Sequence, residues 1–566
     1  MDQTQSFIGF ISWISNPITQ MMLAPLVGCL LVCLIPKKKI LPIKIVALVF
    51  SLLSLLFAVL LLTGMPEGAT SWRPYAGYTD TSQNVQDLKP LGQYTPFQAE
   101  FPGFQYRQDI EWMAIKIGES RSFSVHYDVG IDGLSLPLVL MTCALLPLII
   151  IWGWYRTERV KEFLALTLFM QVGLIGSFVA LDFVLLYLFW EWMLIPMYVL
   201  IGGWGKDREK AARAAIRFFV YTMAGSVFML MSLIICKVIS AGVYSFQIPN
   251  LATFLLNEGY TDVVPWLRMW IFLGFLVAFA VKAPLFPLHT WLPPAHTQAP
   301  AEMSVILAAV MLKSGTYAFL RVLYWALPDQ GYAIGPVVAT LAVVGIVWGA
   351  AVTLVQTDIK RMIAYSSISH MGFIILGCSA MNPLATTGAI YHMVGHGVII
   401  TTLFLLADSI ERRYGTRNVH EIAGLGSAAP LLAGMLSLAA FAGMGFPALA
   451  GFWGELYSLM GAFENGPGWQ TVLVGSIDGS LLLQILAAVA VIGVLTSAVY
   501  MISLLQRTLP GDAPESAKGH VPLREAIVLL PLGVAIIFLG VYPNWLMHMS
   551  AGYSAMLDSI HSAGIY

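Results

Sequence analysis

The sequence predicts an all-α polytopic membrane protein, and three observations lead to this fold class. Apolar residues make up 58% of the 566 residues and charged residues only 11%, whereas soluble domains carry about 25% charged residues. Mean hydropathy is +0.77. The apolar residues gather into segments near the roughly 20 residues that a helix needs to cross a bilayer. The apolar composition implies the lipid bilayer as a partner. A net charge of -1 argues against nucleic acid as a partner.

About fourteen transmembrane helices are expected from these apolar segments, with a few residues of uncertainty at each end. Each expected helix is separated from the next by a short polar or Gly/Pro-containing stretch, apart from one long polar segment after the second helix. The expected spans are 23–35, 45–62, 134–155, 163–181, 183–204, 218–241, 269–292, 303–324, 334–355, 362–380, 385–407, 431–463, 481–505 and 526–541.

The distribution of Lys and Arg gives this arrangement an orientation. Of the 30 basic residues, 20 fall in segments on one side of the membrane and 7 on the other, and Lys237, Lys282 and Lys313 lie within spans. Five of those 7 share the long segment 65–133, where the positive-inside rule is weak, and the other two are Arg268 and Arg321. The richer side is therefore cytoplasmic, which places both the N-terminus and the C-terminus outside. The Met-Asp start has no basic region, so no cleaved signal peptide is expected.

Four charged residues lie inside expected spans and carry the functional prediction. They are Glu191, Lys282, Lys313 and Glu455. A charge at the bilayer centre costs about 2.5–3.5 kcal/mol on insertion scales, so such groups usually mark an ion or proton path. Two alternatives remain open at this point: the lysines and Glu191 form static ion pairs that fix helix register, or Glu455 is a protonated, hydrogen-bonded carboxyl.

Two expected spans are interrupted at corresponding positions. Residues 281–289 read Val-Lys-Ala-Pro-Leu-Phe-Pro-Leu-His, and residues 443–451 read Gly-Met-Gly-Phe-Pro-Ala-Leu-Ala-Gly. Proline removes a backbone donor and breaks a helix. The interruptions fall in the seventh and twelfth spans, five apart, which predicts two inverted five-helix repeats, each containing a broken helix, as at many transport sites. The predicted organisation is 1–64 (two N-terminal helices), 65–133 (extracytoplasmic loop insertion), 134–161 (third helix), 162–328 (first repeat), 329–508 (second, inverted repeat) and 509–566 (C-terminal loop and last helix).

Histidines are spaced between the charged groups. His370 and His396 are candidate proton relays, and His289 and His392 are weaker ones, because imidazole titrates near neutral pH. Each is alternatively a polar helix contact. His392 and His396 also have the i,i+4 spacing of metal ligands, but no third ligand lies nearby in the sequence, so no metal site is expected. The five cysteines include no C-x-x-C pair, which argues against disulfides and iron–sulfur ligation.

The long segment 65–133 is polar and rich in Trp and Tyr. Two roles are equally open for it: packing on a neighbouring subunit, or forming a lid over the chain's own helices. Its large aromatic residues are Trp72, Tyr75, Tyr78, Tyr94, Tyr106 and Trp112.

Two long motifs resemble the antiporter-like subunits of respiratory complex I and their Mrp-type antiporter relatives. The first is Ala-Val-Lys-Ala-Pro-Leu-Phe-Pro-Leu-His-Thr-Trp-Leu-Pro-Pro-Ala-His at 280–296, which continues through 299–304 to Lys313. The second is Thr-Asp-Ile-Lys-Arg-Met-Ile-Ala-Tyr-Ser-Ser-Ile-Ser-His at 357–370. The resemblance covers about residues 125–510. Within the family the M-type subunit, the counterpart of mitochondrial subunit 4, is most similar, through residues 189–198, residues 201–205 and Glu455 in place of the lysine of other types.

The resemblance implies a role for each buried group. Glu191 and Lys282 would form the input pair, Lys313 the central relay, His370 and His396 the connecting path, and Glu455 the exit. It further implies a proton-translocating membrane subunit of NADH:quinone oxidoreductase in an energy-transducing membrane, such as the bacterial inner membrane. This chain would hold no cofactor of its own. NADH, FMN, iron–sulfur clusters and quinone would be in partner subunits, with L-type and N-type antiporter-like subunits as neighbours.

Two other transport functions share these features. One is a subunit of a Mrp-type Na+/H+ antiporter, which Glu455 and the Trp-Glu-Trp stretch at 190–192 argue against. The other is the homologous subunit of a ferredoxin-dependent photosynthetic complex or a membrane-bound hydrogenase, which sequence separates poorly. A purely structural role would leave the buried lysines without an explanation.

Overall fold

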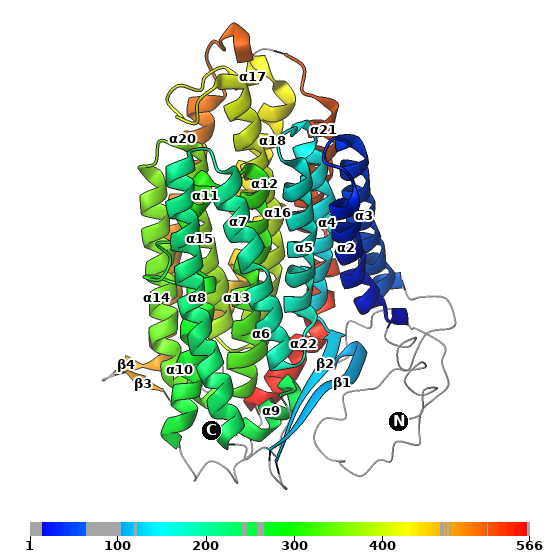
Figure 1. Ribbon diagram of the computed structural model, residues 1–566. Coiled ribbons are helices and arrows are strands. Elements are labelled where there is room, and N and C mark those ends of the chain that lie inside the picture. The colour runs from blue at the N-terminus through cyan, green and yellow to red at the C-terminus, as the bar shows by residue number, and fades with distance from the viewer. Residues whose placement is uncertain are drawn as a thin grey trace.

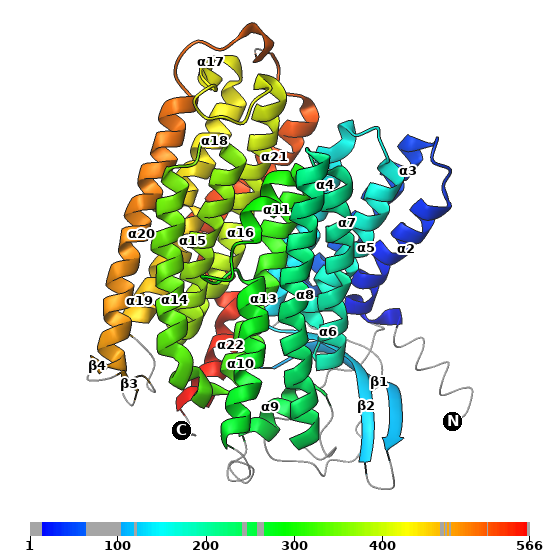
Figure 2. The same ribbon diagram turned by 60° about the vertical axis from the view of Figure 1, so that its left-hand side comes forward.

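Long helices run side by side along one axis in this computed structural model (Figure 1). The structure describes residues 14–63, 103–117, 121–239, 246–256, 265–464, 469, 472–474, 477–517 and 519–562. Figure 2 places helices α2 (Pro17–Leu34) and α3 (Ile40–Thr63) at one edge of the bundle and α20 (Gly479–Thr508) at the other, as Figure 1 does. The C-terminal helix α21 (Leu523–Val541) returns from α20 across the bundle and packs against α4 (Ser135–Trp152), on the side of α3 (Figure 1).

Within the described residues, twelve helical segments are long and apolar enough to cross a membrane, and each coincides with an expected span. One of them is continuous only through two π-helical turns, and another joins two shorter helices. Besides α2, α3 and α20 they are α4 (Ser135–Trp152, extended by η1, Gly153–Tyr155), α5 (Val160–Val179), α6 (Phe183–Trp192) with α7 (Leu194–Trp204), α8 (Arg208–Ile239), the run α12 (Ala301–Ile306), η3 (Leu307–Met311), α13 (Leu312–Ala318) and η4 (Phe319–Tyr324), α14 (Pro328–Leu354), α15 (Ile359–Ser379), α16 (Pro383–Tyr414) and α21 (Leu523–Val541).

The seventh and twelfth expected spans are each divided into two helices. The first consists of α10 (Pro265–Lys282) and α11 (Leu292–Gln298), and the second of α18 (Pro430–Gly443) and α19 (Ala450–Glu464). Proline stands in both interruptions, where it cannot continue the helix. At the first break the Trp291 indole Nε1 donates to the Val281 carbonyl at 3.0 Å, so a side chain replaces a backbone donor that the break removes. The structure therefore contains both predicted breaks.

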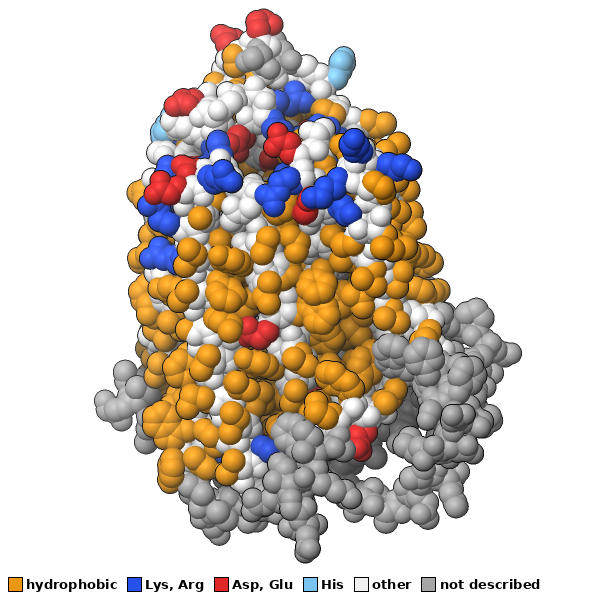
Figure 3. All heavy atoms as spheres, in the orientation of Figure 1, with side chains coloured by type: hydrophobic (Ala, Val, Ile, Leu, Met, Phe, Trp, Pro, Cys, Tyr) orange, Lys and Arg blue, Asp and Glu red, His pale blue; other side chains and the backbone are white. Residues whose placement is uncertain are grey.

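Burial separates central from peripheral helices. Every residue in the spanning window of the α12–η4 segment is buried, whereas only 28% of the window of α3 is. A helix that is apolar all round and fully buried belongs to the core, and one with an exposed apolar face meets lipid. Figure 3 shows the resulting broad hydrophobic belt, with Lys and Arg side chains gathered above it, toward the end of the bundle where Figure 1 labels α17 (Leu425–Ala428).

A two-stranded antiparallel hairpin lies at the opposite end, and the all-helical prediction omitted it. It consists of β1 (Gln105–Ile117) and β2 (Arg121–Ile131), both within the expected loop insertion. The buried Tyr106 donates its hydroxyl to the Leu61 carbonyl at 3.2 Å, while Trp112 is 58% exposed. This part of the insertion thus packs on the chain's own helices. Trp72, Tyr75, Tyr78 and Tyr94 lie outside the described residues.

A further helix, α22 (Asn544–Ser562), follows the last span and was not predicted as a separate element. It lies at the hairpin end of the bundle and packs against α16 (Figure 1). Thr387 and Ser554 share a hydrogen bond of 3.0 Å across this contact. The remaining described elements are short: α9 (Ile248–Leu256), β3 (Leu473–Val474), β4 (Ile477–Asp478) and η6 (Glu515–Ala517).

Candidate functional site

Lys282 is the last residue of α10 and stands directly before the first break. Its side chain is buried, and its Nζ has no hydrogen-bond partner. The Nζ instead lies 5.0 Å from the centroid of the Trp190 ring, a distance at which a cation is attracted to the ring face. The end of a helix and an aromatic ring together hold this charge without fixing it to an acceptor.

Glu191 lies on α6, next to Trp190, and interacts electrostatically with Lys282. Its Oε1 is buried and has no hydrogen-bond partner, and no ion pair within 4.0 Å joins Glu191 to Lys282. The side chain as a whole is half-buried. The structure therefore brings the two predicted input residues into electrostatic range but leaves a gap between them.

Asp182 fixes the start of the helix that carries Glu191. Its carboxylate caps α6 by accepting from the backbone N–H groups of Val184 at 2.8 Å and Leu185 at 3.1 Å. The same carboxylate accepts from the His126 N–H at 3.3 Å, which ties the hairpin to α6. Burial raises the pKa of Asp182 to about 6, although these three hydrogen bonds oppose that shift.

Lys313 is fully buried between two π-helical turns, η3 and η4. Its Nζ donates to the Ala308 carbonyl at 2.8 Å and lies 2.5 Å from Nδ1 of His396. π-helical turns are frequent at functional sites. Here the Ala308 carbonyl and the His396 imidazole on α16 both contact the Lys313 Nζ.

His396, His370 and Glu455 continue the row from Lys313 on three different helices. The His396 and His370 rings are 5.2 Å apart between centroids, and His370 Nδ1 lies 3.2 Å from Oε1 of Glu455. The distance between these last two atoms is that of an ion pair, but the angle excludes a hydrogen bond. All three residues are buried. Four of the six predicted site residues therefore form one contiguous buried group.

Two glycines allow this close packing. A Cβ on Gly454 would lie 2.5 Å from Cβ of His392, and a Cβ on Gly445 would lie 2.5 Å from Oε2 of Glu455. Any side chain at either position would push α19 away from α16 or displace the carboxylate. Gly445 also has a φ of +72°, which an L-residue rarely adopts. The backbone conformation of the second break therefore depends on glycine at position 445.

The first and second halves of the row meet without a hydrogen bond. A Cβ on Gly315 would lie 2.6 Å from the Ala283 N, so the helix of Lys313 packs directly on the first break. No hydrogen bond links Lys282 with Lys313, although both belong to the described residues. His289 lies in the break, and its ring is tilted against that of Trp348 with 4.5 Å between the centroids, while His296 stacks on Phe404 at 4.9 Å. Among the described residues no hydrogen bond joins either imidazole to the row, although His296 interacts electrostatically with Lys313 and His396.

Comparisons with known proteins identify the family of this chain. A family model described as NADH:quinone oxidoreductase/Mrp antiporter, TM, matches residues 180–482, a range that includes all six predicted site residues. The NADH-quinone oxidoreductase subunit M of Rhodobacter capsulatus is 36% identical over 484 residues, covering 82% of this chain and 88% of the relative. This chain belongs to the NADH-quinone oxidoreductase subunit M family. The subunit M of Mycobacterium tuberculosis is 34% identical over 486 residues, covering 79% of this chain and 82% of the relative.

Solved structures show the same fold. A chain of the respiratory complex I from Thermus thermophilus with bound NADH superimposes with a TM-score of 0.75 at 27% identity, covering 95% of this chain and 99% of that chain. A chain of the membrane-bound sulfane sulfur reductase, an archaeal respiratory membrane complex, reaches a TM-score of 0.74 at 21% identity, covering 96% and 98%. The predicted resemblance to antiporter-like complex I subunits is therefore confirmed.

Two buried ionic contacts were missed by the sequence analysis. Arg321, counted as an outside charge, is fully buried in η4 and donates to Asp132 at 2.6 Å and to the Tyr317 hydroxyl at 3.0 Å. Near the other end of the bundle, Arg156 pairs with Glu302 at 3.1 Å. The position of Arg321 inside an unbroken apolar stretch was a signal that it needed a buried partner.

Proposed function

We propose that this chain is the proton-translocating M subunit of a NADH:quinone oxidoreductase, and that protons move along the buried row from Glu191 to Glu455. The observation that carries the proposal is the contiguous group of Lys313, His396, His370 and Glu455 in the fully buried centre of the bundle. Buried ionisable groups within a membrane domain mark proton pathways. Family membership supports the same function, since the relatives bear that subunit's name.

The proposed path begins with the loosely held pair. When Glu191 moves away from Lys282, the ammonium group loses its opposite charge and gives up a proton more readily. That proton crosses to Lys313, and the gap between the two lysines calls for at least one bridging water. Lys313 then passes a proton to Nδ1 of His396, and His370 carries it to the Glu455 carboxylate.

The energy for this transfer comes from outside the chain in our proposal. Moving one charge across the membrane costs about 2.3 kcal/mol per 100 mV. Quinone reduction in partner subunits, which would also hold the NADH site, FMN and iron–sulfur clusters, supplies it. L-type and N-type antiporter-like subunits are the proposed neighbours, and the bacterial inner membrane is the proposed location.

The proposed topology has fourteen spans with both termini outside, in two inverted five-helix repeats at 162–328 and 329–508. Adding the two broken helices to the twelve continuous candidates gives that number. Each repeat then contains one break at its fourth helix, with Lys282 at the first and Glu455 beside the second. Such paired breaks provide the places where charged groups can be held at membrane depth.

Lys282→Ala tests the proposal directly. We expect the variant complex to assemble and to reduce quinone, but to lose NADH-driven proton uptake into inverted membrane vesicles, measured with a pH-sensitive dye. Lys237→Ala is the matched control, because Lys237 also lies in a spanning helix but its Nζ is 5.0 Å from the Phe246 ring, away from the row. Full pumping by assembled Lys282→Ala would contradict the proposal.

The chief competing function is a subunit of a Mrp-type Na+/H+ antiporter, because the matching family model includes both classes. Affinity purification of the tagged full chain separates the two. Co-purification with flavin and iron–sulfur subunits and inhibitor-sensitive quinone reduction support the complex I function. Recovery with small membrane subunits alone supports the antiporter. A ferredoxin-dependent complex or a membrane-bound hydrogenase would instead bring redox subunits that do not oxidise NADH.

A further inference from the structure

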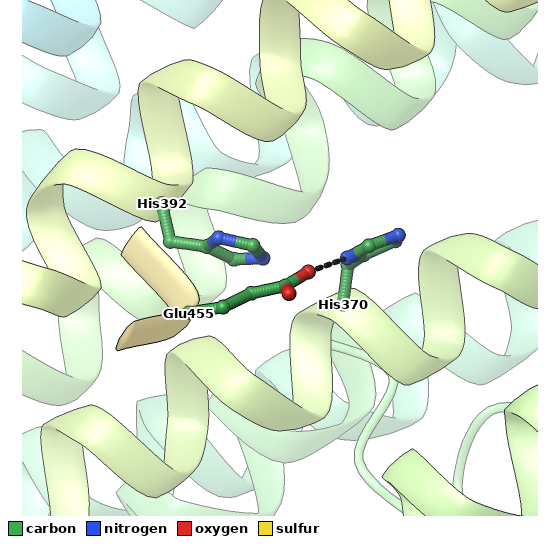
Figure 4. A group of neighbouring side chains, drawn as sticks. All are labelled: His370, His392 and Glu455. Atoms are coloured by element: carbon green, nitrogen blue, oxygen red, sulfur yellow. Dashed lines mark ion pairs between the residues drawn. The ribbon is translucent and has the colours of Figure 1, made fainter. Parts of the chain in front are cut away.

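The side chains of His370, His392 and Glu455 converge beside the second break. The proposed proton path uses two of them, His370 and Glu455. Figure 4 shows the Glu455 carboxylate between the His392 and His370 rings, which come from α16 and α15. One possible ligand atom from each residue lies within 4.8 Å of the others. His392 has no place in the proposed proton path. Its proximity to Glu455 therefore calls for a separate explanation.

The donor set is one that zinc-class ions prefer. Two imidazoles and one carboxylate bind Zn²⁺ in catalytic sites that leave the fourth position for water. Bonds of about 2.0–2.2 Å in a tetrahedral arrangement bring ligand atoms to about 3.4 Å from one another. The present spacing of at most 4.8 Å must therefore shorten by up to about 1.4 Å when an ion binds.

The same atoms lack other partners. His392 is only 1% exposed, and neither of its ring nitrogens has a hydrogen bond. His370 Nδ1 and Glu455 Oε1 likewise have no hydrogen bond. Buried polar atoms are nearly always satisfied by protein, water or an ion. A metal ion bound by these groups would satisfy an atom of each residue at once.

His396 is excluded from this set by its existing contact. Its Nδ1 faces the Lys313 Nζ at 2.5 Å, and its ring centroid is 6.2 Å from that of His392. The i,i+4 pair that the sequence offered as metal ligands is thus divided between two groups. His392 meets residues from α15 and α19, which the sequence spacing could not show.

The second break lies directly beside the cluster. Phe446 in the break is 52% exposed, and the space beside Gly445 is filled by the Glu455 carboxylate. The three atoms nearest to a Cβ on Gly445 all belong to the Glu455 carboxylate group. Glu455 is therefore the residue of the set that lies against the break.

We propose that His370, His392 and Glu455 form a binding site for a zinc-class divalent ion. An ion held there occupies the carboxylate and the imidazole that would otherwise pass a proton, so it blocks the row at its last step. The binding part of this inference is independent of the proposed function, and the blocking part rests on it.

His392→Gln in the intact complex tests the binding, because Gln keeps a polar side chain but is a poor zinc ligand. After removal of loosely bound metal with a chelator, we expect the parent complex to bind one more Zn²⁺ than the variant, measured by mass spectrometry of the metal. Loss of one ligand should weaken the binding at least as much as loss of an outer-shell contact, by about 10–100-fold or more. Zn K-edge absorption of the parent should report nitrogen and oxygen ligands.

His420→Gln is the matched control, because His420 is an exposed histidine outside the cluster. It should bind Zn²⁺ as the parent does. Equal Zn²⁺ binding by the parent and His392→Gln overturns the proposal. Micromolar Zn²⁺, but not Mg²⁺, should slow proton pumping in the parent and spare His392→Gln. If Zn²⁺ binds through His392 and pumping continues, the metal site stands and the exit role of Glu455 is wrong.

Discussion

The two breaks hold their charged groups in opposite ways. At the first, Lys282 and Glu191 interact only through space, and neither the Lys282 Nζ nor Oε1 of Glu191 has a hydrogen bond. At the second, Glu455 lies 3.2 Å from His370. A loosely held pair can respond to a small movement of one helix, whereas a contiguous group can pass a proton on. The difference suggests that the first break is the part that senses a neighbour and the second the part that conducts.

Lys313 lies between the two regions. Its replacement should cause the largest loss of proton pumping. Lys313→Arg keeps a positive charge in place but cannot release a proton, because the guanidinium pKa is above 12. We expect assembled complex with less than about one tenth of the parent's proton pumping, a loss of roughly 1.4 kcal/mol or more in the transfer barrier. The measurement is dye-detected proton uptake in vesicles, normalised to quinone reduction.

Lys313→Met, which removes the charge, is the companion variant. A proton relay requires that both variants fail. If Lys313→Arg pumps normally and Lys313→Met does not, then Lys313 acts through its charge alone, and the row is not continuous.

Shortening each glutamate by one methylene should reduce proton pumping by a smaller factor, and by a different factor at each break. Glu455→Asp withdraws the carboxylate from a direct contact, so we expect proton pumping to fall about tenfold, since small misplacements of a reacting group are costly. Glu191→Asp changes a through-space interaction that varies gradually with distance, so the expected loss is less than about twofold. Equal losses in the two variants would remove the distinction between a sensing and a conducting break.

Much of the fold followed from the sequence because the bilayer imposes simple lengths and tolerates few breaks. The spans were set by apolar stretches near 20 residues, and the breaks by Pro284, Pro287 and Pro447. The hairpin and α22 were missed because they lie outside the long apolar segments, where that constraint gives no signal. Residues 105–131 alternate weakly, and bulges interrupt their pairing.

The candidate site residues could be named from the sequence, but the contacts between them could not. Lys282, Lys313, Glu191 and Glu455 are visible because a charge in an apolar segment is rare. Which helices face one another depends on packing between segments far apart in the chain. The π-helical turns on either side of Lys313 also rotate its helix face relative to a regular 3.6-residue repeat. For that reason, the grouping of His392 with Glu455 and the contact of Lys313 with His396 needed the structure.

The smallest expected effect concerns how closely the helices pack at the two breaks. In Gly454→Ala the new Cβ would lie 2.5 Å from Cβ of His392 and 2.6 Å from its Cα, so the backbones of α16 and α19 must separate. Overpacking of this kind costs about 1–3 kcal/mol, and we expect a lower melting temperature of the purified complex with little change in pumping. Gly434→Ala is the matched control, because a Cβ there meets nothing within 4 Å and alanine favours the helix.

Gly315→Ala applies the same test at the first break, where the Cβ would lie 2.6 Å from the Ala283 N. If the first break is the more adaptable region, Gly315→Ala should lower the melting temperature less than Gly454→Ala, and the reverse order would contradict the comparison.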